Sequence, residues 1–179
     1  GKQEVLTEDL CVLATLDTGR PVSWELTREE EFNGATSRHP MWINVKLGAK
    51  RDGTLTAIQM KVVSDTGAYG NHGGMTLFAS TNALPVYRCG NKKFDGCAVY
   101  TNNLPSGALR GYGQAQTTFA LESAIDELAD KVGIDPMQVR RQSMLRDGDD
   151  VVGLEVEPSD VTIGSYGLDQ CLDQVTDAL

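Results

Sequence analysis

The amino-acid sequence predicts an α+β fold in which helices pack on a mixed or antiparallel sheet. Residues 41–62 alternate apolar and polar side chains around Asp52-Gly53, which indicates a β-hairpin. Residues 121–132 repeat apolar side chains every three or four positions, as in a helix with one face toward a core. Because strands and helices do not alternate regularly, a doubly wound parallel sheet is not expected.

Length and composition are those of a globular protein. The chain has 179 residues, so residues 1–179 are predicted to form a single domain with a sizeable core. The formal net charge of −9 speaks against a nucleic-acid partner or an anionic membrane surface, because both attract clustered basic residues. The sequence contains no long apolar run and no apparent signal peptide, so a cytoplasmic location is expected.

Cysteines and histidines predict no metal site in this chain. The cysteines form no Cys-x-x-Cys pair, so neither zinc nor iron–sulfur ligation is expected, and all four are predicted to be buried or half-buried free thiols. His39 and His72 are the only histidines, which excludes a histidine-rich site. The four cysteines are Cys11, Cys89, Cys97 and Cys171.

The first third of the chain predicts a helix over 5–17, ended by Thr18-Gly19, and a strand over 21–26. Thr27 and Glu30 have the spacing of a capping box, which predicts the start of a short second helix. The hairpin follows, with strands over 41–47 and about 58–62. Trp24 and Trp42 are expected to pack in the interior.

The rest of the chain predicts one more strand and three helices. The glycine-rich segment 67–74 is predicted to turn the chain, and a strand is expected over 96–101. The helix that carries the 121–132 stripe ends at Gly133, and Asp135-Pro136 starts the next one, which runs to about Arg146. Residues 149–164 look irregular, and 168–179 form an amphipathic helix. Arg140 and Arg141 are expected on a solvated helix face.

A segment around Arg110 has the composition of a site. Arg110 lies among small residues, beside Gly111-Tyr112-Gly113 and just before a strong helix. Glycine allows a backbone to approach a ligand closely, and arginine adds a fixed charge with a planar fork of donors. Two interpretations have equal weight. Arg110 either stabilises negative charge that develops in a pocket, or it caps carbonyl groups or pairs with an acid as a structural residue.

Several short motifs occur in a fixed order along nearly the whole chain. Together they resemble the xanthine dehydrogenase/aldehyde oxidase family of molybdenum hydroxylases. The motifs are Gly19-Arg20-Pro21-Val22, Thr27-Arg28-Glu29-Glu30, Arg38-His39-Pro40, Asp52-Gly53-Thr54, Asp65-Thr66-Gly67-Ala68-Tyr69, Ala108-Leu109-Arg110-Gly111-Tyr112-Gly113, Asp135-Pro136 and Gly148-Asp149.

The resemblance implies a subdomain of a molybdopterin-binding domain. Enzymes of this family hydroxylate purines, other N-heterocycles or aldehydes with oxygen from water at a molybdenum–molybdopterin centre. Iron–sulfur clusters and usually FAD, on other domains or subunits, carry the electrons away. The implied partners are therefore a heterocycle or aldehyde substrate, the remainder of the molybdenum subunit, and the iron–sulfur and flavin domains or subunits.

The resemblance also implies roles for residues of the arginine segment. Arg110 matches the family's active-site arginine, which binds substrate and stabilises charge on the heterocycle during attack. Ala108 and Leu109 would lie beside the substrate plane. Gly111 and Gly113 belong to the same motif and are expected to approach the cofactor.

The start of the chain resembles the end of a glycine-rich family segment that approaches the cofactor. Gly1 and Lys2 are the implied cofactor-binding residues, and Gln3 stands where xanthine oxidase has a glutamate that contacts the purine. A neutral amide in that place leaves the identity of the heterocycle open.

The family's catalytic glutamate and most of its pterin-binding segments have no counterpart within residues 1–179. The chain therefore resembles an excised piece of the molybdenum subunit, and in isolation it is expected to hold no cofactor and to be inactive. The carbon monoxide dehydrogenase branch is disfavoured because no cysteine lies in 106–110. An aldehyde oxidoreductase and a non-catalytic assembly module that docks through 168–179 are the alternative functions.

Overall fold

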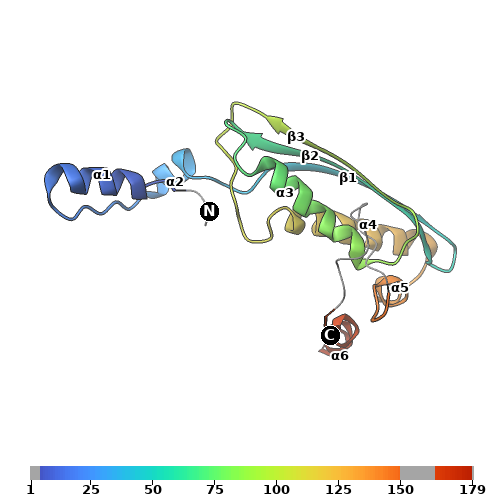
Figure 1. The fold of residues 1–179 in the computed structure, drawn as a ribbon. Coiled ribbons are helices and arrows are strands. Elements are labelled where there is room, and N and C mark those ends of the chain that lie inside the picture. Colours follow the sequence, from blue (N-terminus) through green and yellow to red (C-terminus); the bar gives the residue numbers. More distant parts are fainter. Residues whose placement is uncertain (1–4, 150–163, 179) are drawn as a thin grey trace.

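The computed structural model describes residues 5–149 and 164–178, and its centre is a three-stranded sheet (Figure 1). The strands are β1 (Met41–Ala49), β2 (Leu55–Gly67) and β3 (Lys92–Tyr100), in the order β1-β2-β3. β1 pairs with β2 antiparallel, whereas β2 pairs with β3 parallel. The prediction of an α+β fold with a mixed sheet is therefore confirmed.

The hairpin between β1 and β2 turns at the predicted Asp52-Gly53. Gly53 has a φ of +83°, a conformation that glycine adopts without steric cost. The Asp52 carboxylate accepts a hydrogen bond of 3.0 Å from the Thr54 N–H, and the Lys50 N–H donates to the Thr54 carbonyl at 2.9 Å. The turn residues thus close the hairpin with local hydrogen bonds.

The connection from β2 to β3 is helical, and the glycine pattern did not indicate this. Parallel strands need a long crossover, which is supplied by α3 (Gly73–Ala79) and the 3₁₀ helix η1 (Ser80–Val86). Gly73 begins α3 rather than a turn. A Cβ there would lie 3.0 Å from the Thr66 Cβ, so this glycine marks close packing of α3 on β2. β3 also begins earlier than predicted, at Lys92.

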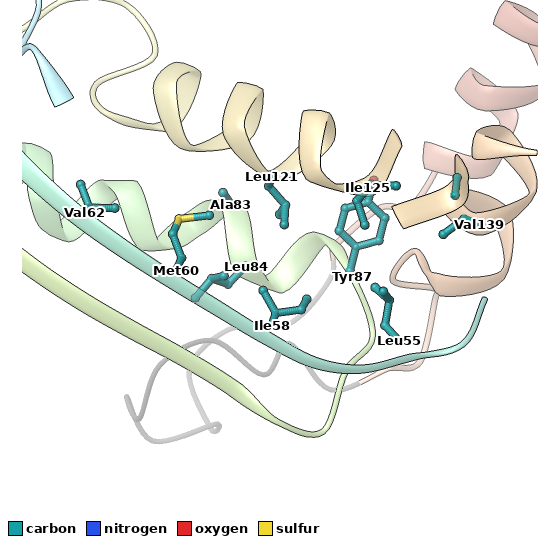
Figure 2. Packing of buried hydrophobic residues seen from close by; sticks show 11 residues of the cluster. Leu55, Ile58, Met60, Val62, Ala83, Leu84, Tyr87, Leu121, Ile125 and Val139 are labelled. Atoms are coloured by element: carbon teal, nitrogen blue, oxygen red, sulfur yellow. The ribbon is translucent and has the colours of Figure 1, made fainter. Parts of the chain in front are cut away.

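The hydrophobic core lies between one face of β2 and the helices that cover it (Figure 2). Ile58, Met60 and Val62 alternate along β2 and are at most 1% exposed. Leu121 and Ile125 of α4 (Gln114–Val132) point toward them, as the helical stripe predicted. η1 fills the remaining space with Ala83 and Leu84, followed by Tyr87.

A half-buried ionic cluster ties α4 to α5 (Pro136–Ser143). Arg140 donates to Glu122 at 2.8 Å and to Asp126 at 2.6 Å, and its side chain is 17% exposed. The Tyr87 hydroxyl donates to Glu122 at 2.7 Å, and burial raises the pKa of Tyr87. The prediction that Arg140 faces solvent was therefore wrong, because i,i+1 pairs such as Arg140 and Arg141 face different sides of a helix.

α5 also ends at Ser143 rather than near Arg146, because the next residue is extended. Met144 forms an isolated antiparallel bridge with Tyr87. The bridge joins the end of α5 to the end of η1. Residues 150–163, predicted to be irregular, fall outside the described residues.

The N-terminal helices α1 (Glu8–Thr18) and α2 (Arg28–Gly34) extend away from the sheet (Figure 1). The capping box at Thr27 and Glu30 is present as predicted. The predicted strand over 21–26 was wrong, since this segment is irregular and no described strand pairs with it. No residue of α1 or of α6 (Leu168–Ala178) is buried in the described chain.

Several side chains are more exposed than predicted. Trp24 and Trp42, expected in the interior, are 47% and 81% exposed. Cys97 and Cys171 are exposed, whereas Cys11 and Cys89 are half-buried as expected. None of the described helices has the length and hydropathy to cross a membrane.

Candidate functional site

The loop that carries Arg110 joins β3 to α4 and is fastened to the end of β2 by Asp65. The Asp65 carboxylate accepts three hydrogen bonds of 2.7 Å, from the Gly67 N–H, the Thr101 hydroxyl and the Asn103 amide. Two of these donors lie at the start of the arginine loop. The Gly67 N–H, followed by the Thr101 hydroxyl, lowers the pKa of Asp65 below its ordinary value.

We expect the contribution of Asp65 to stability to depend on pH. The pKa of Asp65 is lower in the folded chain than in the unfolded chain, where it is about 3.9. The stabilisation is therefore complete above about pH 4 and is lost as the pH falls through the folded pKa. Asp65→Asn should lower the unfolding free energy by about 1–2 kcal/mol at pH 7.

Urea unfolding of the wild type and Asp65→Asn from pH 7 to pH 3 measures this difference, which should shrink below about pH 4. The exposed Asp130 on α4 offers a control. Asp130→Asn should change the unfolding free energy by less than about 0.5 kcal/mol. A difference for Asp65→Asn that stays constant over the whole range would contradict the assignment.

Backbone hydrogen bonds hold the middle of the loop against β2. The Ser106 N–H donates to the Thr66 carbonyl at 3.0 Å, and the Ser106 hydroxyl donates to the Asp65 carbonyl at 3.1 Å. On the other side, the Gly107 N–H donates to the Ser37 carbonyl at 2.8 Å. The loop is thus an ordered part of the fold although it has no regular secondary structure.

The turn after Arg110 has an uncommon backbone. Gly111, Tyr112 and Gly113 have φ values of +95°, +36° and +89°. Positive φ is unfavourable for residues other than glycine, so Tyr112 is strained. A Cβ on Gly113 would lie 2.5 Å from the Ser80 hydroxyl oxygen and would also meet the Thr76 carbonyl. The Gly113 position is therefore explained by the packing of α4 against α3 and η1.

The turn is also held from outside by Arg38, which precedes β1. Its guanidinium donates a hydrogen bond of 2.7 Å to the Arg110 carbonyl. Its neighbour His39 is 2% exposed, and the His39 carbonyl accepts from the Gln116 amide at 3.0 Å. The segment Arg38-His39-Pro40 therefore attaches the start of β1 to Arg110 and to the first turn of α4.

The Arg110 side chain is exposed, and within the described residues it forms no hydrogen bond or ion pair. An arginine that caps carbonyl groups or pairs with an acid would need a hydrogen-bond or ion-pair partner. Ala108 is half-buried and Leu109 is 37% exposed, so the three neighbouring residues predicted to contact substrate lie on one ordered loop. The arrangement leaves the guanidinium available to an anionic or electron-rich ligand.

A concave surface of about 850 Å³ lies beside this loop. Leu109 and Ser37 form one wall, and Glu31 and Phe32 of α2 form another. A second groove, of about 720 Å³, lies between β1 and α4, where Trp42 and Phe119 are exposed. Only the first groove includes a residue of the arginine loop.

The residues after Arg110 fit an anionic cofactor group. The N–H groups of Ala115 and Gln116, in the first turn of α4, have no acceptor within residues 5–149 and 164–178. Unpaired N–H groups at the start of a long helix bind phosphate well, and the helix dipole adds to the attraction. Gly111 precedes this turn. Gly1, Lys2 and Gln3, the other predicted binding residues, lie outside the described residues.

The described residues contain no group of three or more His, Cys, Asp or Glu side chains that could hold a metal ion.

Two residues of the site were not singled out from the sequence as functional candidates. Asp65 belongs to a motif that supported the resemblance, but only the structure shows that it holds the loop. Tyr112 contacts His72, 40 positions earlier in the chain. A local sequence pattern cannot predict a contact between residues so far apart in the sequence.

Comparisons with known proteins agree with this picture. The sequence model of the molybdopterin cofactor-binding domain family matches residues 1–144. The chain is 43% identical over 152 residues to a "probable hypoxanthine oxidase" of Escherichia coli, covering 84% of this chain and 16% of that protein. It is 41% identical over 150 residues to one of the probable xanthine dehydrogenase subunits of Bacillus subtilis, covering 83% and 20%.

Among solved structures, the aldehyde oxidoreductase of Desulfovibrio gigas superimposes with a TM-score of 0.84 at 31% sequence identity. The match covers 98% of this chain and 19% of that one. The chain thus spans a fifth or less of the length of each of these relatives. The chain belongs to the molybdopterin cofactor-binding domain family, and its resemblance to the xanthine dehydrogenase/aldehyde oxidase family is confirmed.

Proposed function

We propose that this chain is part of the catalytic subunit of a molybdenum hydroxylase that acts on a purine or another N-heterocycle, with water as the oxygen source. The observation that carries the proposal is the Arg110 guanidinium, which is exposed and unpaired within the described chain on a loop fixed by hydrogen bonds. The hypoxanthine oxidase and xanthine dehydrogenase names of the two sequence relatives support a purine.

The cofactor of the proposed enzyme is molybdenum–molybdopterin. When bound, it supplies the two-electron oxidation chemistry. Gly111, which is exposed, and the first turn of α4 would approach its anionic groups, together with Gly1 and Lys2. Iron–sulfur and FAD domains or subunits are the proposed electron acceptors, and the cytoplasm is the proposed location.

In this proposal Arg110 is the catalytic residue of the chain. Attack on a purine carbon places negative charge on the heterocycle, and a guanidinium aimed at that charge binds the transition state more tightly than the substrate. Ala108 and Leu109 would contact the substrate plane. Gln3 would donate or accept one hydrogen bond at the heterocycle edge.

The test uses the full-length holoenzyme and hypoxanthine as substrate. Arg110→Ala should lower kcat/KM about a hundredfold, as for loss of one strong transition-state donor. Arg110→Lys should recover part of the activity, because lysine keeps the charge but lacks the planar fork. Arg51 is exposed in the β1–β2 turn, so Arg51→Ala is a matched control that should leave kcat/KM unchanged. Full purine activity in Arg110→Ala would refute the assigned role.

An aldehyde oxidoreductase is the second candidate, favoured by the structural match to the Desulfovibrio gigas enzyme. An aldehyde has no heterocycle on which charge accumulates, so Arg110 has less to stabilise. Turnover of benzaldehyde that exceeds that of hypoxanthine, and that survives Arg110→Ala, would support this candidate over the first.

A further inference from the structure

A side-chain hydrogen bond joins the glycine-rich segment to the arginine turn. The His72 Nδ1 and the Tyr112 hydroxyl oxygen lie 2.6 Å apart. The two rings meet edge to face, with centroids 5.7 Å apart and an interplanar angle of 80°. Either group donates, depending on the histidine tautomer. The distance is short for a hydrogen bond of this kind, and the ring contact restricts both side chains to one geometry.

The backbone of His72 is held in place by α3 and β2. It is the residue before α3, and its carbonyl accepts the Thr76 N–H at 2.9 Å. The next residue, Gly73, is buried and packs closely on Thr66 of β2. The imidazole is therefore attached to the sheet through α3.

Tyr112, in contrast, belongs to a turn with a strained backbone. Its φ of +36° is unfavourable for a tyrosine, and it lies between two glycines with positive φ. Its N–H closes the turn by donating to the Leu109 carbonyl at 2.7 Å. The backbone of Arg110 lies inside that closed turn. Whatever holds the Tyr112 ring in place therefore also holds the backbone that carries Arg110.

We propose that the His72–Tyr112 hydrogen bond is a positioning contact that orients the Arg110 turn toward substrate. The proposal rests on the proposed function of Arg110. In it, Tyr112 acts through the arginine, and His72 acts through Tyr112. Neither residue needs to touch the reacting atoms for the effect. Loss of the hydroxyl should let the turn relax toward negative φ and move the guanidinium out of its binding geometry.

A double-mutant cycle in the full-length holoenzyme tests the coupling, with hypoxanthine as substrate. Tyr112→Phe removes only the hydroxyl and should lower kcat/KM about three- to tenfold, the range for one hydrogen bond. In the Arg110→Ala background the same substitution should have no further effect, because the arginine through which it acts is absent. An equal loss in both backgrounds would show a general structural role and overturn the proposal.

Variants of His72 test the other half of the pair. His72→Leu should reproduce the loss seen in Tyr112→Phe. His72→Asn keeps a polar atom near the position of Nδ1 and should restore activity toward the wild-type value. Tyr69 is a matched control, since it is also a tyrosine with positive φ, but it is 92% exposed. Tyr69→Phe should leave kcat/KM unchanged.

Hydrogen exchange in the holoenzyme gives a readout that does not depend on turnover. The amides of 109–113 should exchange faster in Tyr112→Phe and in His72→Leu, and at the wild-type rate in Tyr69→Phe. Unchanged exchange in Tyr112→Phe would overturn the proposal whatever the kinetics. If Arg110→Ala leaves purine turnover intact while exchange still accelerates, the proposed function fails and the anchoring of the turn stands.

Discussion

Gly67→Ala should destabilise the chain by about 2–5 kcal/mol and detach the arginine loop from β2. Gly67 has a φ of +67°, which costs an alanine about 1–2 kcal/mol. A Cβ there would lie 2.6 Å from the carbonyl carbon of Leu104 and 2.9 Å from the Pro105 Cα. These are backbone atoms that cannot rotate aside, so overpacking adds about 1–3 kcal/mol.

The same substitution should also weaken the contacts that hold the loop. The Gly67 N–H donates to Asp65 at 2.7 Å, and the Gly67 carbonyl accepts from the Thr101 N–H at 3.2 Å. Displacement of Leu104 and Pro105 by the added methyl group would distort both hydrogen bonds. Urea unfolding measures the stability change, and hydrogen exchange of 101–107 should accelerate.

Gly133→Ala is the matched control for Gly67→Ala. Gly133 caps α4 with a φ of +72°, yet a Cβ there would meet no atom within 4 Å. Only the conformational cost applies, so the expected loss is about 1–2 kcal/mol. If the two variants lose the same stability, the contact with Leu104 is not the cause.

Ile125→Ala should lower the unfolding free energy by about 2–5 kcal/mol, the range for large-to-small changes in a packed core. Ile125 is 0% exposed in the middle of α4 and faces the core formed with β2. Neighbouring side chains come from both the sheet and η1, so they cannot collapse together into the cavity. A loss below about 1 kcal/mol would mean that the core relaxes around the change.

Phe119→Ala is the matched control on the same helix. Phe119 is 76% exposed in the groove between α4 and β1. In the isolated chain its removal should change stability by less than about 0.5 kcal/mol. Denaturant titration of the two purified variants beside the wild type measures both effects.

The elements that could be predicted are those in which the chemistry is local. The hairpin around Asp52-Gly53, the capping box at Thr27, and the stripe that includes Leu121 and Ile125 each depend on residues within a few positions of one another. Their physical causes are turn conformation, capping of free N–H groups and burial of one helix face. All three occur as predicted.

The errors arose where the outcome depends on distant parts of the chain. Residues 21–26 have the composition of a strand, but a strand also needs a neighbour, and none of the described strands lies beside it. Trp42 lies on a strand with the right alternation, yet no described segment covers that side chain. Arg140 is half-buried because α5 packs close to α4, where Glu122 and Asp126 accept its hydrogen bonds.

The sequence by itself determined the family and the residues of the arginine loop, because both follow from short motifs in a fixed order. It also determined the order of the main elements, because each depends on a local pattern of apolar and polar residues. Only the tertiary structure decided that β3 runs parallel to β2, that Asp65 fastens the loop, and that His72 meets Tyr112. These contacts join residues that are about 33–40 positions apart. Long-range pairing follows from the path of the whole chain and from the packing of α3 and α4 on one face of the sheet, which no local pattern encodes.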